Sequence, residues 1–146
     1  MRTIIRLMHK EDLSVICSIQ KEYPELNWSR DSFYKEIENK NSVSLVSELK
    51  GQVIGYIIAK IVIDEAQILN FFVHQKFREM GVGHLLMTSL LQTLIDEGAL
   101  FVYLETRKNN ESAIRIYERF GFLGVAIRKD YYVNPTDDGI FMIKGL

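Results

Sequence analysis

The segment VHQKFREMGVGH, residues 73–84, decides how the chain is organised, because it separates strand-like sequence from helix-like sequence. Before it, residues 67–73 form an apolar run rich in residues that favour strands. After it, leucines spaced four apart predict a helix over 83–97. Gly81 and Gly83 lie at the start of that helix, where backbone amides are unpaired and the helix dipole favours an anion. The segment is therefore a candidate binding loop for a pyrophosphate.

The two glycines alone leave two interpretations open. In a phosphate-binding loop, the missing Cβ atoms let the backbone approach a ligand closely. In an ordinary strand-to-helix turn they serve the turn only, and nothing in the loop by itself separates the two. A nucleotide P-loop is excluded because no Gly-Lys-Ser/Thr follows, and a dinucleotide motif is disfavoured because Leu86 stands where the third glycine belongs.

On both sides of this loop the hydrophobic period alternates in a consistent order. Alternating or continuous apolar runs predict strands, and spacings of three and four predict helices. The predicted strands cover 3–7, 42–48, 53–63, 67–73, 100–105, 122–128 and 139–144. The predicted helices cover 10–23, a short segment capped by Ser29, 83–97 and 110–120. This order predicts a mixed α/β (α+β) domain built on one central sheet.

Composition and charge narrow the classes of protein. With 146 residues, 47% of them hydrophobic and 25% charged, the chain suits a single domain over residues 1–146. A net charge of −1 lacks the basic excess of nucleic-acid binders. The lone Cys17 cannot form an internal disulfide, and no signal peptide or membrane span is evident. We therefore expect a cytoplasmic protein. We also expect no metal, because His74 and His84 have no further candidate metal ligands near them in the sequence.

Two motifs in this order resemble a known family. Arg78-x-x-Gly81-x-Gly83 resembles the coenzyme A-binding signature of the GNAT family of N-acetyltransferases, and NNESAIRIYERFGF (109–122) resembles its second signature. The resemblance covers nearly the whole chain. It implies the GNAT fold, a mixed and mostly antiparallel sheet of about seven strands flanked by four helices. It also implies acetyl-CoA as cofactor, with the pantetheine arm between two splayed parallel strands.

Within that family the chain looks most like the enzymes that acetylate ribosomal-protein alanines and other protein N-termini. The residues that carry this likeness are Asn27-Trp28-Ser29, 63–66, Leu104-Glu105-x-Arg107, 127–132 and 137–139. The resemblance implies a protein or peptide N-terminus as acceptor, with a ribosomal protein as one candidate. Monomer and homodimer both stay open.

The resemblance also implies a set of cofactor-binding residues. Backbone groups of Phe71, Phe72 and Val73 are expected to meet the pantetheine amides. The loop contributes Arg78, Glu79, Met80, Gly81, Val82, Gly83 and His84. Asn110 is expected to contact the cofactor, although asparagine there also suits a helix cap. Glu79 and His84 depart from the more basic family pattern, so backbone N–H groups are expected to hold the diphosphate.

Amine acetylation needs a base for the amine and a proton for the departing thiolate. By resemblance, Glu105 is the candidate base and Tyr117 the candidate acid. Residue types alone also allow a structural Glu105, paired with Arg107 or a lysine, and a Tyr117 that is simply a core aromatic.

Four further residues are candidates for the acceptor site. Glu25 lies in the loop between the first two helices and is either a second candidate base or a solvated charge. Tyr131 and Tyr132 are expected at the mouth where a peptide backbone enters, because tyrosine combines apolar area with a hydrogen bond. Trp28 either lines the same groove or anchors the loop.

Three functions follow from this sequence. The first is N-terminal acetylation of proteins. The second is acetylation of a small amine by the same fold, which the paired tyrosines disfavour. The third is a non-catalytic acyl-CoA-binding module, which the intact Glu105 and Tyr117 disfavour.

Overall fold

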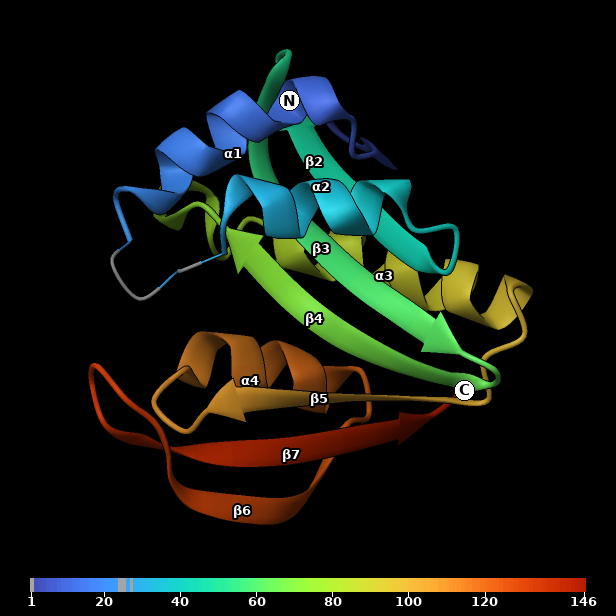
Figure 1. The fold of residues 1–146 in the computed structure, drawn as a ribbon, viewed down its shortest axis with the longest axis vertical. Coiled ribbons are helices and arrows are strands. Elements are labelled where there is room, and N and C mark those ends of the chain that lie inside the picture. The colour runs from blue at the N-terminus through green and yellow to red at the C-terminus, as the bar shows by residue number, and fades with distance from the viewer. Residues whose placement is uncertain (1, 24–25, 27) are drawn as a thin grey trace.

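The computed structural model describes residues 2–23, 26 and 28–146, and a single seven-stranded sheet forms its centre (Figure 1). The strands are β1 (Thr3–Leu7), β2 (Ser42–Leu49), β3 (Gln52–Val62), β4 (Glu65–Val73), β5 (Phe101–Arg107), β6 (Leu123–Tyr132) and β7 (Asp137–Gly145). The helices are α1 (Leu13–Gln20), α2 (Arg30–Glu38), α3 (Val82–Asp96) and α4 (Glu111–Arg119), with short 3₁₀ helices η1 (Lys10–Asp12) and η2 (Gln75–Phe77). The strand order is β1-β2-β3-β4-β5-β7-β6, and only β4 and β5 pair in parallel. The predicted mixed, mostly antiparallel sheet with four helices is confirmed.

Several element boundaries differ from the sequence predictions by a few residues. The first predicted helix is divided into η1 and α1 and ends at Gln20. β5 continues to Arg107, so Glu105 lies inside the strand, and β6 continues to Tyr132. Ser29 caps α2 as predicted, because its Oγ accepts a hydrogen bond from the Ser32 amide at 3.0 Å. Within the described part of the chain, no helix is long and apolar enough to cross a membrane.

Helices cover both faces of the half of the sheet formed by β1 to β4. Figure 1 shows α1 and α2 in front of these strands and α3 behind them. The front layer buries a cluster that includes Leu13, Ile16, Phe33, Tyr56, Ile58 and Phe72. The rear layer buries a larger cluster that includes Ile57, Ala59, Leu86, Leu90, Leu94 and Leu104. The three layers make this half of the sheet the rigid frame of the molecule.

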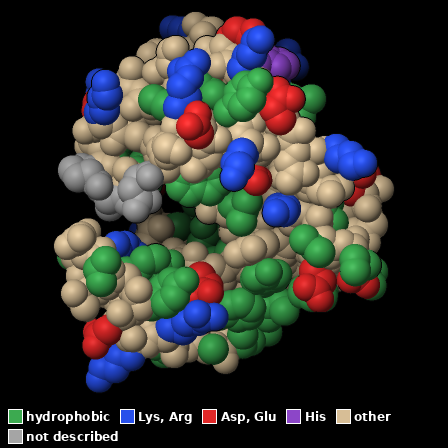
Figure 2. All heavy atoms as spheres, in the orientation of Figure 1, with side chains coloured by type: hydrophobic (Ala, Val, Ile, Leu, Met, Phe, Trp, Pro, Cys, Tyr) green, Lys and Arg blue, Asp and Glu red, His purple; other side chains and the backbone are tan. Residues whose placement is uncertain are grey.

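The other half of the sheet, formed by β5, β7 and β6, has a helix on one face only. Side chains of β5 alternate: Val102, Leu104 and Thr106 are buried on the rear face. The side chains between them point to the front face, where Tyr103 stacks on Phe141 with ring centroids 5.4 Å apart. Figure 2 shows hydrophobic side chains gathered on the lower part of this front surface. Side chains on the front face of β5 therefore remain accessible.

The two halves separate where β4 and β5 diverge. Their parallel pairing covers only Glu65–Gln67 against Phe101–Tyr103, although both strands continue beyond it. A bulge interrupts the pairing of β3 with β4, because Ile58 is opposite Asn70 and the next residue of β3 is opposite Ile68. The extra residue inverts the side-chain alternation along β4. Before the bulge Ile68 faces the rear core; after it, Phe72 faces the front core and Val73 the rear.

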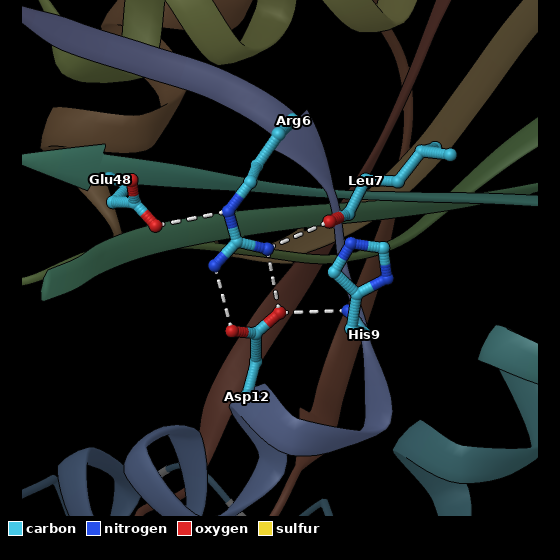
Figure 3. A network of polar contacts seen from close by, with 5 residues as sticks. All are labelled: Arg6, Leu7, His9, Asp12 and Glu48. Atoms are coloured by element: carbon cyan, nitrogen blue, oxygen red, sulfur yellow. Dashed lines mark hydrogen bonds and ion pairs between the residues drawn. The ribbon is translucent and has the colours of Figure 1, made fainter. Parts of the chain in front are cut away.

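A charged network fixes the N-terminal strand to the sheet (Figure 3). Arg6 of β1 donates two hydrogen bonds of 2.9 Å to the Asp12 carboxylate and one of 3.0 Å to Glu48 of β2. The backbone N–H of His9 donates to Asp12 at 2.8 Å. The network therefore joins β1, η1 and β2, and so sets where α1 begins.

Candidate active site

A cleft of about 700 Å³ opens where β4 and β5 diverge. Figure 2 shows the surface hollowed between the upper and lower halves of the molecule. Nine of the predicted cofactor residues line this cleft: Phe71, Phe72, Val73, Arg78, Glu79, Gly81, Gly83, His84 and Asn110. Met80 is exposed and outside the lining, and the Val82 side chain is buried in the rear core. Only the backbone of Val82 is therefore available to a ligand.

The loop between β4 and α3 has the backbone of an anion site. Glu79 and Gly81 have positive φ angles of 63° and 83°, and Gly81 is the N-cap of α3. A glycine N-cap has no side chain to accept hydrogen bonds from the first turn, so those amides stay free for a ligand. The backbone alternates between left-handed and right-handed conformations, as it does in the anion-binding motif called a nest. These observations support the expectation that backbone N–H groups hold the diphosphate.

The two glycines of the loop are required for different reasons. A Cβ on Gly81 would meet nothing within 4 Å, so its requirement is the left-handed backbone. A Cβ on Gly83 would lie 2.9 Å from Ile116 Cδ1 and 3.2 Å from Phe71 Cζ. Gly83 therefore lets α3 pack closely against a β4 side chain and an α4 side chain that both line the cleft.

Arginines reach the cleft from two directions. The Nε of Arg78 donates to the Val73 carbonyl at 2.9 Å, and its guanidinium lies 5.8 Å from the Phe72 ring centroid. Arg78 thus braces the end of β4. Arg115 and Arg119 of α4 also line the cleft, although they were not among the residues predicted from the sequence. Their spacing of four residues places them on one polar face of the helix, and this pattern could have predicted them. Cations here favour a phosphorylated ligand.

Asn110 immediately precedes α4, but its side chain makes no capping hydrogen bond. Its amide instead donates to Thr106 Oγ1 at 3.3 Å, which orients Asn110 toward the end of β5. Asn110 is therefore the N-cap of α4 by position, without a capping hydrogen bond from its side chain. The prediction that it contacts the cofactor agrees with its place in the cleft lining.

Glu105 lies on the uncovered front face of β5. The expected structural partner was Arg107, but Arg107 instead donates to the carbonyls of Val133 and Pro135 at 3.2 and 2.7 Å. Glu105 faces Arg128 of β6, whose Nε lies 3.4 Å from Oε2. That Oε2 is buried and, among the described residues, has no hydrogen-bond partner. A carboxylate oxygen in this condition retains capacity for a further donor.

Tyr117 lies on the rear side of the sheet and is 5% exposed. Its ring packs between Phe71 and Phe122, with centroids at 5.9 and 5.7 Å. Burial, reinforced by the nearby Tyr132, raises the pKa of Tyr117 well above its ordinary value of 10.0. The hydroxyl is therefore protonated at neutral pH. Tyr117 is also a core aromatic, so the two interpretations of this residue are compatible.

Tyr132 interacts electrostatically with both candidate catalytic residues, Glu105 and Tyr117. Burial first, and then the charge of Glu105, raise the pKa of Tyr132. Since Tyr132 in turn acts on Tyr117, these three side chains belong to one neighbourhood. Tyr132 also stacks under the Arg107 guanidinium at 4.6 Å and packs edge-to-face on Tyr131 at 5.0 Å. Tyr132 thus lies near Glu105, and the assignment of the tyrosine pair to the mouth of an acceptor site stays a prediction.

Of the other two residues predicted for the acceptor site, Trp28 lies in the described structure and Glu25 does not. Trp28 packs against Phe33 of α2 with centroids 5.1 Å apart and joins the front core. Its carbonyl accepts a hydrogen bond from Gln20 at 2.9 Å, which favours the loop-anchor interpretation. Glu25 lies outside the described residues. Across the described ranges 2–23, 26 and 28–146, no group of three or more His, Cys, Asp or Glu side chains could hold a metal.

Comparisons with known proteins agree with this site. The sequence profile of the Acetyltransferase (GNAT) family matches residues 13–122. The chain is 32% identical over 142 residues to a putative ribosomal protein bS18-alanine N-acetyltransferase of Bacillus subtilis, covering 97% of this chain and 94% of that one. It is 30% identical over 135 residues to the ribosomal protein bS18-alanine N-acetyltransferase of Escherichia coli K12, covering 92% and 89%.

Solved structures give the same result. The crystal structure of the ribosomal-protein-S18-alanine N-acetyltransferase from Escherichia coli superposes with a TM-score of 0.89 at 26% identity, covering 99% of this chain and 94% of that one. The structure of Ard1 from Thermoplasma volcanium superposes with a TM-score of 0.90 at 27% identity, covering 100% and 99%. The chain therefore belongs to the acetyltransferase (GNAT) family, and it is an N-acetyltransferase that uses acetyl-CoA.

Proposed function

We propose that this enzyme acetylates the α-amine of a protein or peptide N-terminus in the cytoplasm, with a ribosomal protein as the leading candidate. The relatives from Bacillus subtilis and Escherichia coli are named for the N-terminal alanine of ribosomal protein bS18. One observation supports the proposal most directly. The buried Oε2 of Glu105, which has no hydrogen-bond partner among the described residues, lies near Tyr132 on the front face of the sheet, at the strand divergence.

The residues present fit the acetyl donor. The cleft is lined by residues from both halves of the sheet, and the free amides at the start of α3, together with Arg115 and Arg119 of α4, border it. Acetyl-CoA supplies the acetyl group as a thioester. Phe71 gives the inner part of the cleft an apolar wall. Gly83 and Asn110 flank it from α3 and from the turn before α4.

Glu105 and Tyr117 have complementary roles in this proposal. The acceptor arrives as an ammonium, and the Glu105 carboxylate takes its proton so that the nitrogen lone pair becomes available. The Tyr117 hydroxyl holds a proton on the opposite side of the sheet for the departing sulfur. The raised pKa of Tyr117 keeps that proton in place at neutral pH.

The shape of the acceptor side favours a peptide over a small amine. The front face of β5 and β7 is uncovered beyond Glu105, and Tyr103 and Phe141 continue it as an apolar surface. Tyr131 is 49% exposed at its edge. An extended chain could lie along such a surface, whereas a small amine needs an enclosed pocket.

The test is a panel of peptides that differ at their first residue, each with a free or an N-acetylated amine, assayed by coenzyme A release. Free-amine alanyl peptides are expected to be turned over, and acetylated ones are not. Turnover of polyamines or amino acids instead would favour the small-amine alternative. Acetyl-CoA binding with no turnover of any amine would favour a non-catalytic module.

Variants then test the two roles. Glu105→Gln and Tyr117→Phe are each expected to lower kcat by about 100-fold or more. Glu118→Gln removes an exposed carboxylate beside Tyr117, and Tyr34→Phe removes a hydroxyl from the exposed surface of α2; both controls should retain activity. Wild-type turnover by Glu105→Gln would contradict the base assignment.

A further inference from the structure

Arg128 is a residue that the proposed reaction does not yet use, although it is the cation nearest to Glu105 in the described structure. It comes from β6, which does not pair with β5, since β7 lies between them. Across the sheet, Arg107 of β5 is opposite Gly139 of β7, and Gly139 is opposite Arg128. Arg128 must therefore cross β7 diagonally to reach Glu105.

Gly139 makes room for the Tyr131 ring beside this crossing. It has no side chain, and the space above it is filled by the Tyr131 ring, whose Cδ2 lies 3.1 Å from where a Cβ would be. Tyr131 can fold back in this way because the pairing of β6 with β7 is irregular between Arg128 and Tyr132. The Arg128 guanidinium then lies 5.1 Å from the centroid of the Tyr131 ring.

The ion pair between Arg128 and Glu105 is loose. Its separation of 3.4 Å exceeds the roughly 2.7–2.9 Å of a charge-assisted hydrogen bond. Glu105 is mostly buried, with 20% of its side chain exposed, whereas Arg128 is 56% exposed. Glu105 Oε2 has no hydrogen bond despite the nearby guanidinium. The Arg128 guanidinium is therefore weakly bound, and the Glu105 carboxylate lacks part of its hydrogen bonding.

We propose that Arg128 is the resident counter-ion of Glu105 and that the α-ammonium of the acceptor displaces it. This inference rests on the proposed function. An ammonium is compact and carries three donors, so it can make the close contact with Oε2 that the guanidinium does not make. Tyr131 stays available to the displaced guanidinium as an aromatic face. Arg128 is thus a positioning residue that sets the apparent affinity for the acceptor.

Kinetics test this competition. Arg128→Gln removes the competing charge and is expected to lower the peptide KM roughly fivefold, the range for one partly exposed ion pair. The kcat value and the KM for acetyl-CoA should stay within twofold, because the displaced residue takes no part in the chemistry. Arg128→Lys keeps a cation on the strand and should retain most of the wild-type KM. A higher peptide KM or a lower kcat in Arg128→Gln would overturn the proposal.

Lys129→Gln is the matched control, since it removes a neighbouring positive charge from the same exposed strand. It should leave the peptide KM unchanged. An equal fall of KM in this variant would indicate a general charge effect at β6 and would likewise overturn the role of Arg128.

A second measurement does not depend on the identity of the acceptor. The Arg128 Nε–H resonance can be assigned by its loss in Arg128→Gln, and then followed by NMR while alaninamide is added. We expect this resonance to move with alaninamide and not with N-acetyl-alaninamide, which lacks the ammonium. Equal shifts with the two compounds, or no shift with either, would overturn the inference. A selective shift without peptide turnover would leave the inference standing and the proposed function refuted.

Discussion

At the scale of single residues, Asp12 is the clearest case of a buried charge that is fully paired. Burial raises the pKa of its carboxyl group, but the hydrogen bonds from Arg6 and from the His9 amide outweigh burial and leave the pKa below the ordinary 3.8. The same contacts raise the pKa of Arg6. Each member of the network therefore favours the charged form of the other.

This pairing predicts an acid-sensitive stability. Because the folded-state pKa of Asp12 is lowered, its contribution is present above pH 3.8 and is lost as pH falls through the folded value. Asp12→Asn is expected to reduce the free energy of unfolding at pH 7 by about 1–3 kcal/mol, the usual cost of losing hydrogen bonds to a charged group. The difference from wild type should shrink below pH 3, measured by urea unfolding.

Asp64→Asn is the control for the loss of one carboxylate, because the structure gives Asp64 no side-chain hydrogen bond or ion pair among the described residues. It should change stability little at either pH. A constant difference between Asp12→Asn and wild type from pH 7 to pH 2 would contradict the linkage to Asp12.

At the scale of elements, the start of α3 depends on the fit of three elements around Gly83. The first turn of α3 lies against Phe71 of β4 and Ile116 of α4. Both side chains also line the cleft. Packing and ligand binding are therefore coupled at this position.

Gly83→Ala tests that coupling. The added Cβ would lie 2.9 Å from Ile116 Cδ1, closer than real contacts allow, so the end of the Ile116 side chain must shift. We expect a loss of about 1–3 kcal/mol in unfolding free energy and a several-fold higher KM for acetyl-CoA. Thermal unfolding and steady-state kinetics would measure the two effects.

The compensating variant is Ile116→Val, which removes the clashing Cδ1 atom. Gly83→Ala combined with Ile116→Val should recover part of both losses. Gly145→Ala, where a Cβ meets nothing within 4 Å, should behave as wild type. No rescue by the double variant would show that the cost of Gly83→Ala arises elsewhere.

At the scale of the whole molecule, the cleft lies between two half-sheets that share few backbone contacts. β4 and β5 pair over only Glu65–Gln67 and Phe101–Tyr103. A ligand in the cleft contacts both halves at once, because the lining includes Phe71 from one half and Arg107 from the other. Ligand binding should therefore stabilise the molecule as a unit.

Acetyl-CoA at 100 times its Kd is expected to add about 2.7 kcal/mol to the unfolding free energy. For a chain of this size the Tm should rise by roughly 5–10 °C, measured by scanning calorimetry. Acetyl-pantetheine lacks the diphosphate and should produce a smaller shift at the same concentration. Equal shifts from the two compounds would argue against anion binding by the α3 amides and the α4 arginines.

Much of the fold follows from local sequence patterns. The leucine spacing of Leu86, Leu90 and Leu94 predicts α3, and the strand boundaries agree with the structure to within a few residues. The two family motifs predict the cofactor cleft, and nine of the eleven predicted cofactor residues line it. Such patterns succeed because helix and strand periods, and the turn preferences of glycine, are properties of neighbouring residues.

The charge partners of the site do not follow from local sequence. Glu105 pairs with Arg128 because β7 lies between β5 and β6, because Gly139 leaves a gap in β7, and because an irregularity in β6 directs Tyr131 into that gap. Sequence alone suggested Arg107 or a lysine as the partner. Strand order, register and bulges are set by non-local pairing, which no local period encodes.

The sequence by itself determined the family, the element order and the loop proposed to bind the cofactor, since these depend on short-range spacing and backbone preference. Only the tertiary structure decided which charged side chains lie close enough to interact. It brought Arg115 and Arg119 to the cleft and left Glu105 with a loosely held counter-ion. The physical reason is that contacts across a sheet depend on register, and one extra residue in a strand moves every later side chain to the opposite face.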